Sequence, residues 1–357
     1  MNSEWTIRVV FVGVLTLGVQ GLSDIAKLGV LVVDGTTGNP IPNVSMTGVF
    51  HKNNGWLGFK GAPEPDMDEV VTDANGRCKV WGRTNTGKVS CIIDSAPHGY
   101  YFKSKGAGYL FSHKNIFGVW EPDNVVVTIR LQRVERPIPL FVKNARSEVV
   151  RGVFPEGVDT ISYDLMMGDW LPPIGEGKVA DVEFTRNPRR ILGEIEVLAY
   201  DGRVKREAYR DSIVVKFKGN ENGLTEIQQP LGPELRIRTA PEDGYSPEYV
   251  CWEGREKTYA AGGWGLRHES NYEDKRCFCF RIRTRRDDKG RLVEAYYGKI
   301  YRDFHIGYER QRATKIETIG FFYYLNPQPL DRNLEWDMKS NLCPNPGEMG
   351  NIGDRDP

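Results

Sequence analysis

Two turn segments in the first third of the chain constrain its fold more than any other feature of the sequence. The first follows residues 30–33, a half-buried strand by pattern, and residues 34–38 supply the polar side chains and glycines that tight turns need. Pro40 and Pro42 cannot donate to a β-ladder, so we expect the next strand at residues 44–50.

The second segment is the tight reversal from Asp73 to Gly76. It separates short β-branched runs at residues 69–71 and 78–81, and an Asp-x-x-Gly reversal between such runs is typical of a hairpin. We expect these two strands to pair with each other. A closing strand follows at residues 125–131.

Residues 28–132, which contain both turns, resemble the carboxypeptidase regulatory-like domain, a transthyretin-like module. The resemblance rests on the extended first strand, the turn from Thr37 to Ile41 and the turn from Asp73 to Gly76. It implies a Greek-key sandwich of seven strands in a secreted binding or spacer module that has no catalysis of its own.

The remaining chain also reads as β-structure. The whole chain of 357 residues suffices for two or three domains, and its 39 glycines and 21 prolines lie among short β-branched and aromatic runs, which predicts an all-β protein. We expect a linker at residues 133–139, a larger antiparallel β-sandwich domain at 140–330 and an irregular C-terminal tail at 331–357. Equal numbers of basic and acidic residues, 48 each, argue against a nucleic-acid partner.

Residues 1–23 have the pattern of a signal peptide. A short polar start ends at Arg8, residues 9–22 are apolar, and Gly21 and Ser23 suit a cleavage site. The apolar run is shorter than the roughly twenty residues of a membrane-spanning helix, although a retained anchor or a buried strand are alternatives. We therefore expect a secreted, periplasmic or cell-surface protein without a stable membrane span after processing.

The six cysteines are interpreted in the light of export. Cys78 and Cys91 lie on strands predicted to be neighbours, so we expect a disulfide between them. The pairing of Cys251, Cys277, Cys279 and Cys343 is left open by the sequence. Buried free thiols are the alternative for all six.

Residues 277–285 and 292–304 form the clearest hairpin of the second domain. Strand alternation places Phe278, Phe280 and Ile282 on a core face and the arginines on the other face. A symmetric turn would set Arg283 opposite Glu294 and Arg281 opposite Tyr296. The arginine row is then a solvated sheet face, or alternatively a surface that binds an anionic glycan.

Tryptophans in Gly- and Pro-rich loops suggest a ligand site of another kind. Trp56, Trp170 and Trp264 could stack on sugar rings, or they could close the ends of the sandwiches. We name these three, with Arg281 and Arg283, as the candidate ligand-binding residues.

Two acidic groups could carry chemistry. Asp164, Asp169 and Glu176 surround the Trp170 loop and could act as the paired carboxylates of a glycosidase. Asp66, Asp68 and Glu69 could offer oxygens to calcium, although their spacing is not that of an EF-hand and a hydrated acidic loop is the alternative. The sequence has no GxSxG, HExxH, Walker or dinucleotide motif, and we expect neither a cofactor nor a dedicated metal site.

The sequence thus leads to three hypotheses on function. The first is a secreted, non-catalytic binding or presentation protein for cell-surface polysaccharide or surface assembly, with a glycan or a cell-surface protein as its partner; this context comes from the resemblance of residues 28–132. The second is a glycan-active enzyme with its carboxylates in the second domain. The third is a structural spacer subunit of a surface layer or filament.

Overall fold

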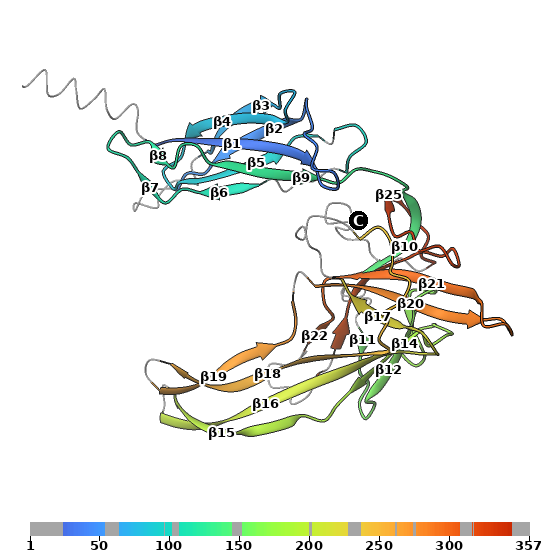
Figure 1. Ribbon diagram of the computed structural model, residues 1–357. Helices are drawn as coiled ribbons and strands as arrows, with labels where there is room; N and C mark the ends of the chain where they lie inside the picture. Colours follow the sequence, from blue (N-terminus) through green and yellow to red (C-terminus); the bar gives the residue numbers. More distant parts are fainter. Residues whose placement is uncertain are drawn as a thin grey trace, which may run out of the picture. The chain divides into compact units, whose positions relative to one another are not determined.

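The computed structural model of the protein describes residues 24–53, 64–95, 97–101, 107–144, 152–199, 202–227, 237–260, 263–273, 276–307, 316 and 318–344. Over these ranges the protein is all-β, as predicted. The chain divides into two compact units, residues 1–135 and 136–357 (Figure 1), so that the division falls within the expected linker. The predicted signal peptide and Trp56 lie outside the described residues.

Unit 1 is a sandwich of two sheets with a small two-stranded ribbon at one end. One sheet has the order β4-β1-β9 and the other the order β3-β2-β5-β6, while β7 pairs with β8. The strand bounds are β1 Ile25–Asp34, β2 Ser45–Phe50, β3 Asp66–Val71, β4 Arg77–Arg83, β5 Lys88–Ile93, β6 Gly108–Leu110, β7 His113–Lys114, β8 Trp120–Glu121 and β9 Val126–Leu131. The closing strand β9 runs parallel to β1, and the other pairs are antiparallel.

The core of unit 1 follows from strand alternation. On β1, Leu28, Val30 and Val32 point inward and are at most 1% exposed. They meet Met46 and Phe50, which alternate in the same way on β2 of the facing sheet. Burial of each of these side chains stabilises the fold by about 1.5–3 kcal/mol, which explains why the period-two pattern is readable in the sequence.

The expected hairpin across Asp73 to Gly76 is only half correct. The reversal exists, because the Asp73 carboxylate accepts the amides of Asn75 and Arg77 and Gly76 has a φ of 67°. However, β3 pairs with β2 and β4 pairs with β1, so the turn leads from one sheet to the other.

Unit 2 contains a six-stranded sheet, a seven-stranded sheet and a three-stranded sheet. Their orders are β17-β20-β21-β24-β10-β25, β13-β12-β14-β16-β18-β19 with β15 also on β16, and β11-β23-β22. The strand bounds are β10 Ile138–Asn144, β11 Gly152–Val153, β12 Thr160–Asp164, β13 Asp169–Trp170, β14 Val182–Arg186, β15 Arg190–Ala199, β16 Gly202–Phe217, β17 Gly223–Glu226, β18 Glu248–Ala260, β19 Gly263–Ser270, β20 Cys277–Arg286, β21 Leu292–Tyr301, β22 His305–Gly307, β23 Thr318–Gly320, β24 Phe322–Leu325 and β25 Trp336–Asn341.

An aromatic cluster forms the main core of unit 2. It contains Tyr163 and Phe184 from the seven-stranded sheet, Phe280 and Tyr323 from the six-stranded sheet, and Phe321 from the link between β23 and β24, all at most 1% exposed. Several of these rings meet edge to face at centroid distances of 5–6 Å, which is a favourable geometry for aromatic pairs. The sheets are therefore held together by aromatic packing.

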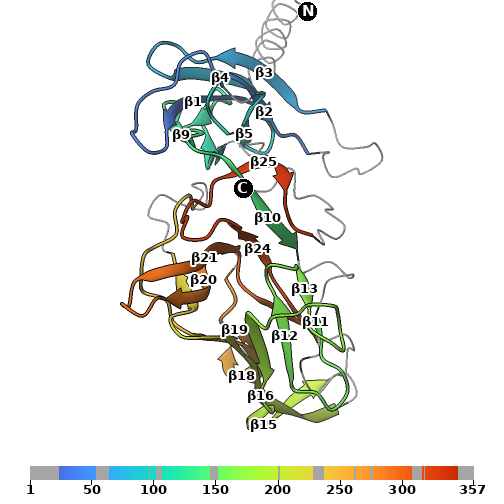
Figure 2. The same ribbon diagram turned by 90° about the vertical axis from the view of Figure 1, so that its right-hand side faces the viewer.

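The tail was expected to be irregular, but part of it forms strand β25. β25 pairs with β10 and lies beside it in both views (Figures 1 and 2), and Trp336 is 2% exposed against Tyr324. This tertiary contact supplies a strand that the Pro- and Asn-rich composition does not suggest. Within the described ranges, no helix is long and apolar enough to cross a membrane.

Two β-hairpins extend from the core of unit 2 (Figure 1). Residues 202–210 of β16 pair with β15, and residues 253–260 of β18 pair with β19. Only the second half of β16 contributes to the core, through Ile213, Val215 and Phe217. We call β15, residues 202–210 of β16, residues 256–260 of β18 and β19 the arm.

Candidate functional site

The carboxylates predicted as a catalytic set hold the loops around β13. Asp164 is 1% exposed, and its oxygens accept hydrogen bonds from the amides of Met166, Met167, Lys178 and Val179. Asp169 accepts the amides of Trp170 at 2.8 Å and Glu176 at 2.9 Å. The lone pairs of both aspartates therefore stabilise the loops, and this geometry does not present them as an acid and base pair to a substrate.

Arg283 is part of the same network. Its guanidinium donates to both oxygens of Asp181, at 2.8 and 2.9 Å, and to Asp164 at 2.8 Å. Burial raises the pKa of the Asp181 carboxyl, and the hydrogen bonds from Arg283 act against that rise. The guanidinium is thus occupied by two buried carboxylates, which does not fit its predicted role as a ligand contact.

The predicted arginine face of β20 is not a solvated surface. Arg281 is 8% exposed and donates to the carbonyls of Glu221 and Glu242 while it covers the ring of Tyr245. Cys277 and Cys279, on the same face, are also buried. Both faces of β20 are covered from Cys277 to Ile282, and of the predicted arginine row mainly Arg285 is exposed, so the strand has no continuous arginine surface for an anionic glycan.

The predicted register of this hairpin is also wrong. Arg281 lies opposite Tyr297, and Arg285 takes the place opposite Glu294, with 2.9 Å between the charged atoms. A β-bulge between Ile282 and Arg285 adds one residue to β20, and Arg283 within it has a φ of 51°. The bulge turns Arg283 toward the aspartates.

Trp170 is a core residue. It is 2% exposed and meets the rings of Tyr163 at 4.8 Å and Phe184 at 5.5 Å. The alternative that this tryptophan closes the end of the sandwich fits the structure, whereas stacking on a sugar does not. The backbone of Trp264 lies in β19, and its side chain, like the whole of Trp56, is outside the described residues.

The acidic run proposed for calcium protects a strand edge. Asp68 accepts the amide of Trp81 at 2.8 Å, and Asp66 accepts that of Arg83 at 2.9 Å. Glu69 lies on the same strand, in register with Thr47. In the described part of the chain, no group of three or more His, Cys, Asp or Glu side chains could hold a metal ion.

The predicted disulfide between Cys78 and Cys91 is not formed, and both side chains are thiols. The two residues lie in different sheets, on β4 and β5, and the Cys78 thiol contacts the Met46 sulfur at 3.1 Å. Burial raises the pKa of Cys78 to about 11 and that of Cys91 to about 12. Both are therefore neutral core side chains at physiological pH.

Two arginines brace the base of the arm. Arg189 donates to both oxygens of Asp211, with a shortest distance of 2.6 Å, and stacks 3.8 Å from the ring centroid of Tyr209. Arg210 stacks 3.9 Å from Trp252 and forms an ion pair with Glu256. These contacts connect β16 to the start of β15 and to β18, and so fix the direction in which the arm leaves the core.

The arm presents two adjacent aliphatic side chains. β15 has a bulge at Leu192, because Ile191 lies opposite Tyr209 and Gly193 opposite Ala208. Ile191 is 50% exposed and Leu192 38% exposed. Among the described residues, no strand pairs with the outer edge of β15 or of β19.

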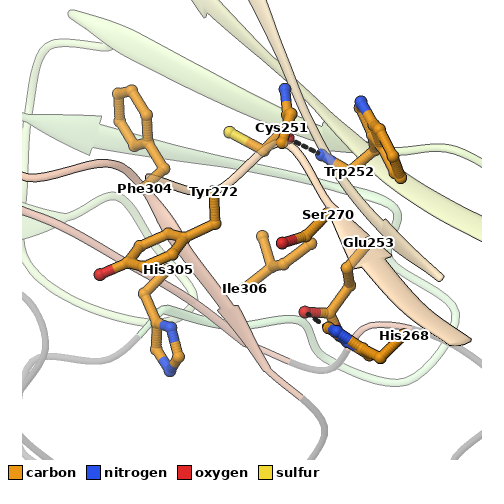
Figure 3. A pocket seen from close by; sticks show the side chains of 10 residues that line it. Cys251, Trp252, Glu253, His268, Ser270, Tyr272, Phe304, His305 and Ile306 are labelled. Carbon is orange, nitrogen blue, oxygen red and sulfur yellow. Dashed lines mark hydrogen bonds and ion pairs between the residues drawn. The ribbon is translucent and has the colours of Figure 1, made fainter. Parts of the chain in front are cut away.

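A pocket with a volume of about 500 Å³ lies at the base of the arm (Figure 3). Glu253 from β18, His268 and Ser270 from β19, Tyr272 and His305 supply its polar groups and rings. Phe304, Ile306 and Cys251 add apolar surface. The walls therefore combine rings, hydroxyls and one carboxylate.

Two side-chain pairs order the pocket. The Glu253 carboxylate, 17% exposed, lies 4.0 Å from the His268 imidazole, which is 64% exposed. The rings of Tyr272 and His305 are 6.2 Å apart and nearly perpendicular. Burial raises the pKa of Cys251 well above its ordinary value, so this thiol is not an activated nucleophile. The sequence contains no motif for this pocket, because its residues come from three separate segments.

No protein-family model matches the chain, and no curated protein matches it. Among solved structures, the chain is similar to a group B streptococcus pilus 2b backbone protein, with 14% identity, 30% of this chain and 41% of that chain covered, and a TM-score of 0.21. It is similar to a streptococcal ancillary pilin with 13% identity, 58% of this chain and 56% of that chain covered, and a TM-score of 0.23. It is also similar to the full-length major pilin SpaD from Corynebacterium diphtheriae, with 10% identity, 74% of this chain and 90% of that chain covered, and a TM-score of 0.23. The chain thus spans about half the length of the two streptococcal proteins, and at these TM-scores the likeness assigns no function.

Proposed function

We propose that this protein is a non-catalytic structural subunit of an extracellular assembly and that it contacts a neighbouring copy through the arm. The observation that carries the proposal is the bulged outer edge of β15, where Ile191 and Leu192 are exposed beside an edge with which no described strand pairs. Soluble proteins usually protect such edges, and a second copy can cover the edge by strand addition.

Contacts at the β4 edge of unit 1 and at the base of the arm in unit 2 support the assembly proposal. Asp66 and Asp68 cover the amides of the β4 edge in unit 1, whereas no described strand pairs with the outer edge of β15. The bracing of Arg189 and Arg210 gives the arm a fixed direction, which a repeated contact between copies requires. The predicted export places such an assembly outside the cytoplasm.

Sedimentation velocity over a range of protein concentrations tests the proposal. The wild-type chain should form larger species as concentration rises, and the double variant Ile191→Lys/Leu192→Lys should remain a monomer because charges disfavour burial. The matched control is Val293→Lys, since Val293 on β21 is 38% exposed, as Leu192 is. A wild-type chain that is monomeric throughout, or a double variant that assembles normally, would refute the proposal.

A second function is favoured by the pocket at the base of the arm. Rings beside hydroxyls and a carboxylate suit a saccharide, whose C–H faces stack on rings while its hydroxyls form hydrogen bonds. A glycan array should then show signals that His305→Ala removes and His113→Ala retains; both imidazoles are exposed, but only His305 lines the pocket. An array without signals would count against this second function and leave the assembly proposal standing.

A further inference from the structure

The end of unit 1 formed by β7 and β8 carries two very exposed apolar side chains. Ile116 is 90% exposed and Phe117 is 66% exposed, and they are neighbours in the turn between the two strands. Single exposed apolar residues are common, but an adjacent pair at a protruding turn exposes a continuous apolar surface. We call residues 115–118 the tip.

The turn holds these side chains in place. The Asn115 side-chain oxygen accepts the amides of Phe117 at 3.0 Å and Val119 at 3.1 Å. The Gly118 amide donates to the Asn115 carbonyl, and Gly118 has a φ of 76°. The apolar pair is therefore presented by a hydrogen-bonded turn, which reduces the entropy lost when it binds a partner.

Amphipathic residues lie behind the tip. The Lys114 ammonium pairs with Asp24 and lies 4.7 Å from the ring centroid of Trp120. Tryptophan and lysine side chains have an apolar body and a polar end. Such side chains are typical of the boundary between lipid tails and water. The charges are paired internally, since His113 also lies 3.4 Å from Glu121.

The position of Asp24 indicates which partner the tip meets. Its amide donates to the Gly118 carbonyl at 2.8 Å, so the chain enters unit 1 directly beside the tip. The apolar run of residues 9–22 ends two positions before Asp24. Where this run is retained as an anchor, the alternative to a cleaved signal peptide, the lipid bilayer that takes it up lies next to Ile116 and Phe117.

We propose that the tip inserts into the surface of a lipid bilayer, with Ile116 and Phe117 among the acyl chains and with Lys114 and Trp120 at the boundary with water. Because the nearby charges are paired, insertion depends on apolar burial and not on anionic lipid. This inference is independent of the proposed assembly through the arm, and either can fail alone.

Photocrosslinking of the full chain bound to phosphatidylcholine vesicles tests the inference. With benzoylphenylalanine in place of Phe117, light should produce lipid adducts, and phosphatidylserine in the vesicles should not increase them. The control carries the same group in place of Trp81, which is 60% exposed on β4, and should give none. Adducts that are no more frequent at 117 than at 81, or adducts at 117 only to a second copy of the chain, would overturn the inference.

Hydrogen exchange provides a second measurement that does not alter the wild-type turn. Vesicles should slow exchange at residues 115–118, and Ile116→Ser/Phe117→Ser should lose this protection. The double variant Met67→Ser/Val71→Ser changes another exposed apolar pair, on β3, where Met67 is 62% and Val71 58% exposed. This control variant should keep the protection at residues 115–118. Exchange at the tip that vesicles leave unchanged would also overturn the inference.

Discussion

Arg283 and Asp181, 102 positions apart in the chain, form a two-pronged ion pair whose N···O distances are 2.8 and 2.9 Å. The Asp181 side chain is 2% exposed and that of Arg283 28% exposed. The pair connects the bulge of β20 to the loop before β14, and through Asp164 it also holds the start of the loop after β12. A residue with the pattern of a surface arginine thus connects two sheets of unit 2.

Replacing Arg283 should strongly destabilise unit 2. Arg283→Met leaves Asp181 and Asp164 buried without their cation, which should reduce the free energy of unfolding by about 3–5 kcal/mol. Arg285→Met removes the pair with Glu294, in which Arg285 is 69% exposed, and should cost less than about 1 kcal/mol. Urea unfolding of both variants measures the difference, and equal losses would contradict the network described.

Unit 1 should lose stability in acid through Asp34. Burial raises the pKa of this carboxyl, but hydrogen bonds from the amides of Thr37 and Thr36 and from the Tyr100 hydroxyl outweigh burial and lower it below its ordinary value of 3.8. The folded state therefore binds this proton less readily than the unfolded state. The resulting stability is present above pH 3.8 and is lost as the pH falls through the folded pKa.

Urea unfolding at about pH 5.5 and about pH 3 checks this sign. Asp34→Asn should destabilise unit 1 at the higher pH, and the gap from wild type should narrow at the lower pH. A gap that is constant between the two pH values would show that ionisation of Asp34 does not contribute.

Two glycines with similar backbone angles should respond differently to alanine. Gly38 has a φ of 74° with open space around an added Cβ, so Gly38→Ala should cost only the left-handed backbone, about 1–2 kcal/mol. Gly76 has a φ of 67°, and its Cβ would lie 2.5 Å from the Val32 carbonyl oxygen, which should add about 1–3 kcal/mol. Thermal unfolding of both variants shows which one loses more stability. An equal loss of stability would contradict the close approach of the turn to β1.

The cysteines should behave as buried thiols. Titration with a thiol reagent in denaturant, without reductant, should find all six, because none forms a disulfide. In the native protein Cys91 and Cys251 should react very slowly, since both are buried and hold raised pKa values. A count of four in denaturant would show that one disulfide exists and would contradict this prediction.

The turns were readable from the sequence because their chemistry is local. Asp34 accepts amides two and three residues ahead, and Asp73 accepts amides two and four residues ahead. The alternation of Phe278, Phe280 and Ile282 likewise identified the core face of β20, because a strand repeats every two residues.

The candidate site could not be predicted in the same way. The residues expected to bind a ligand are tryptophans and arginines, which often lie at surfaces. Trp170 and Arg281 are nevertheless buried. The pocket instead combines Glu253, His268 and His305, whose types and spacing form no motif. Their proximity depends on the pairing of β18 with β19 and on the position of β22.

The all-β class, the local turns and the inward face of the strands could be predicted from the residues themselves. The folded chain was needed to show that β3 and β4 belong to different sheets, that β9 runs parallel to β1, and that Arg283 enters a buried network. Turns and alternation depend on neighbouring residues, whereas sheet pairing and burial depend on partners that can lie a hundred or more positions away.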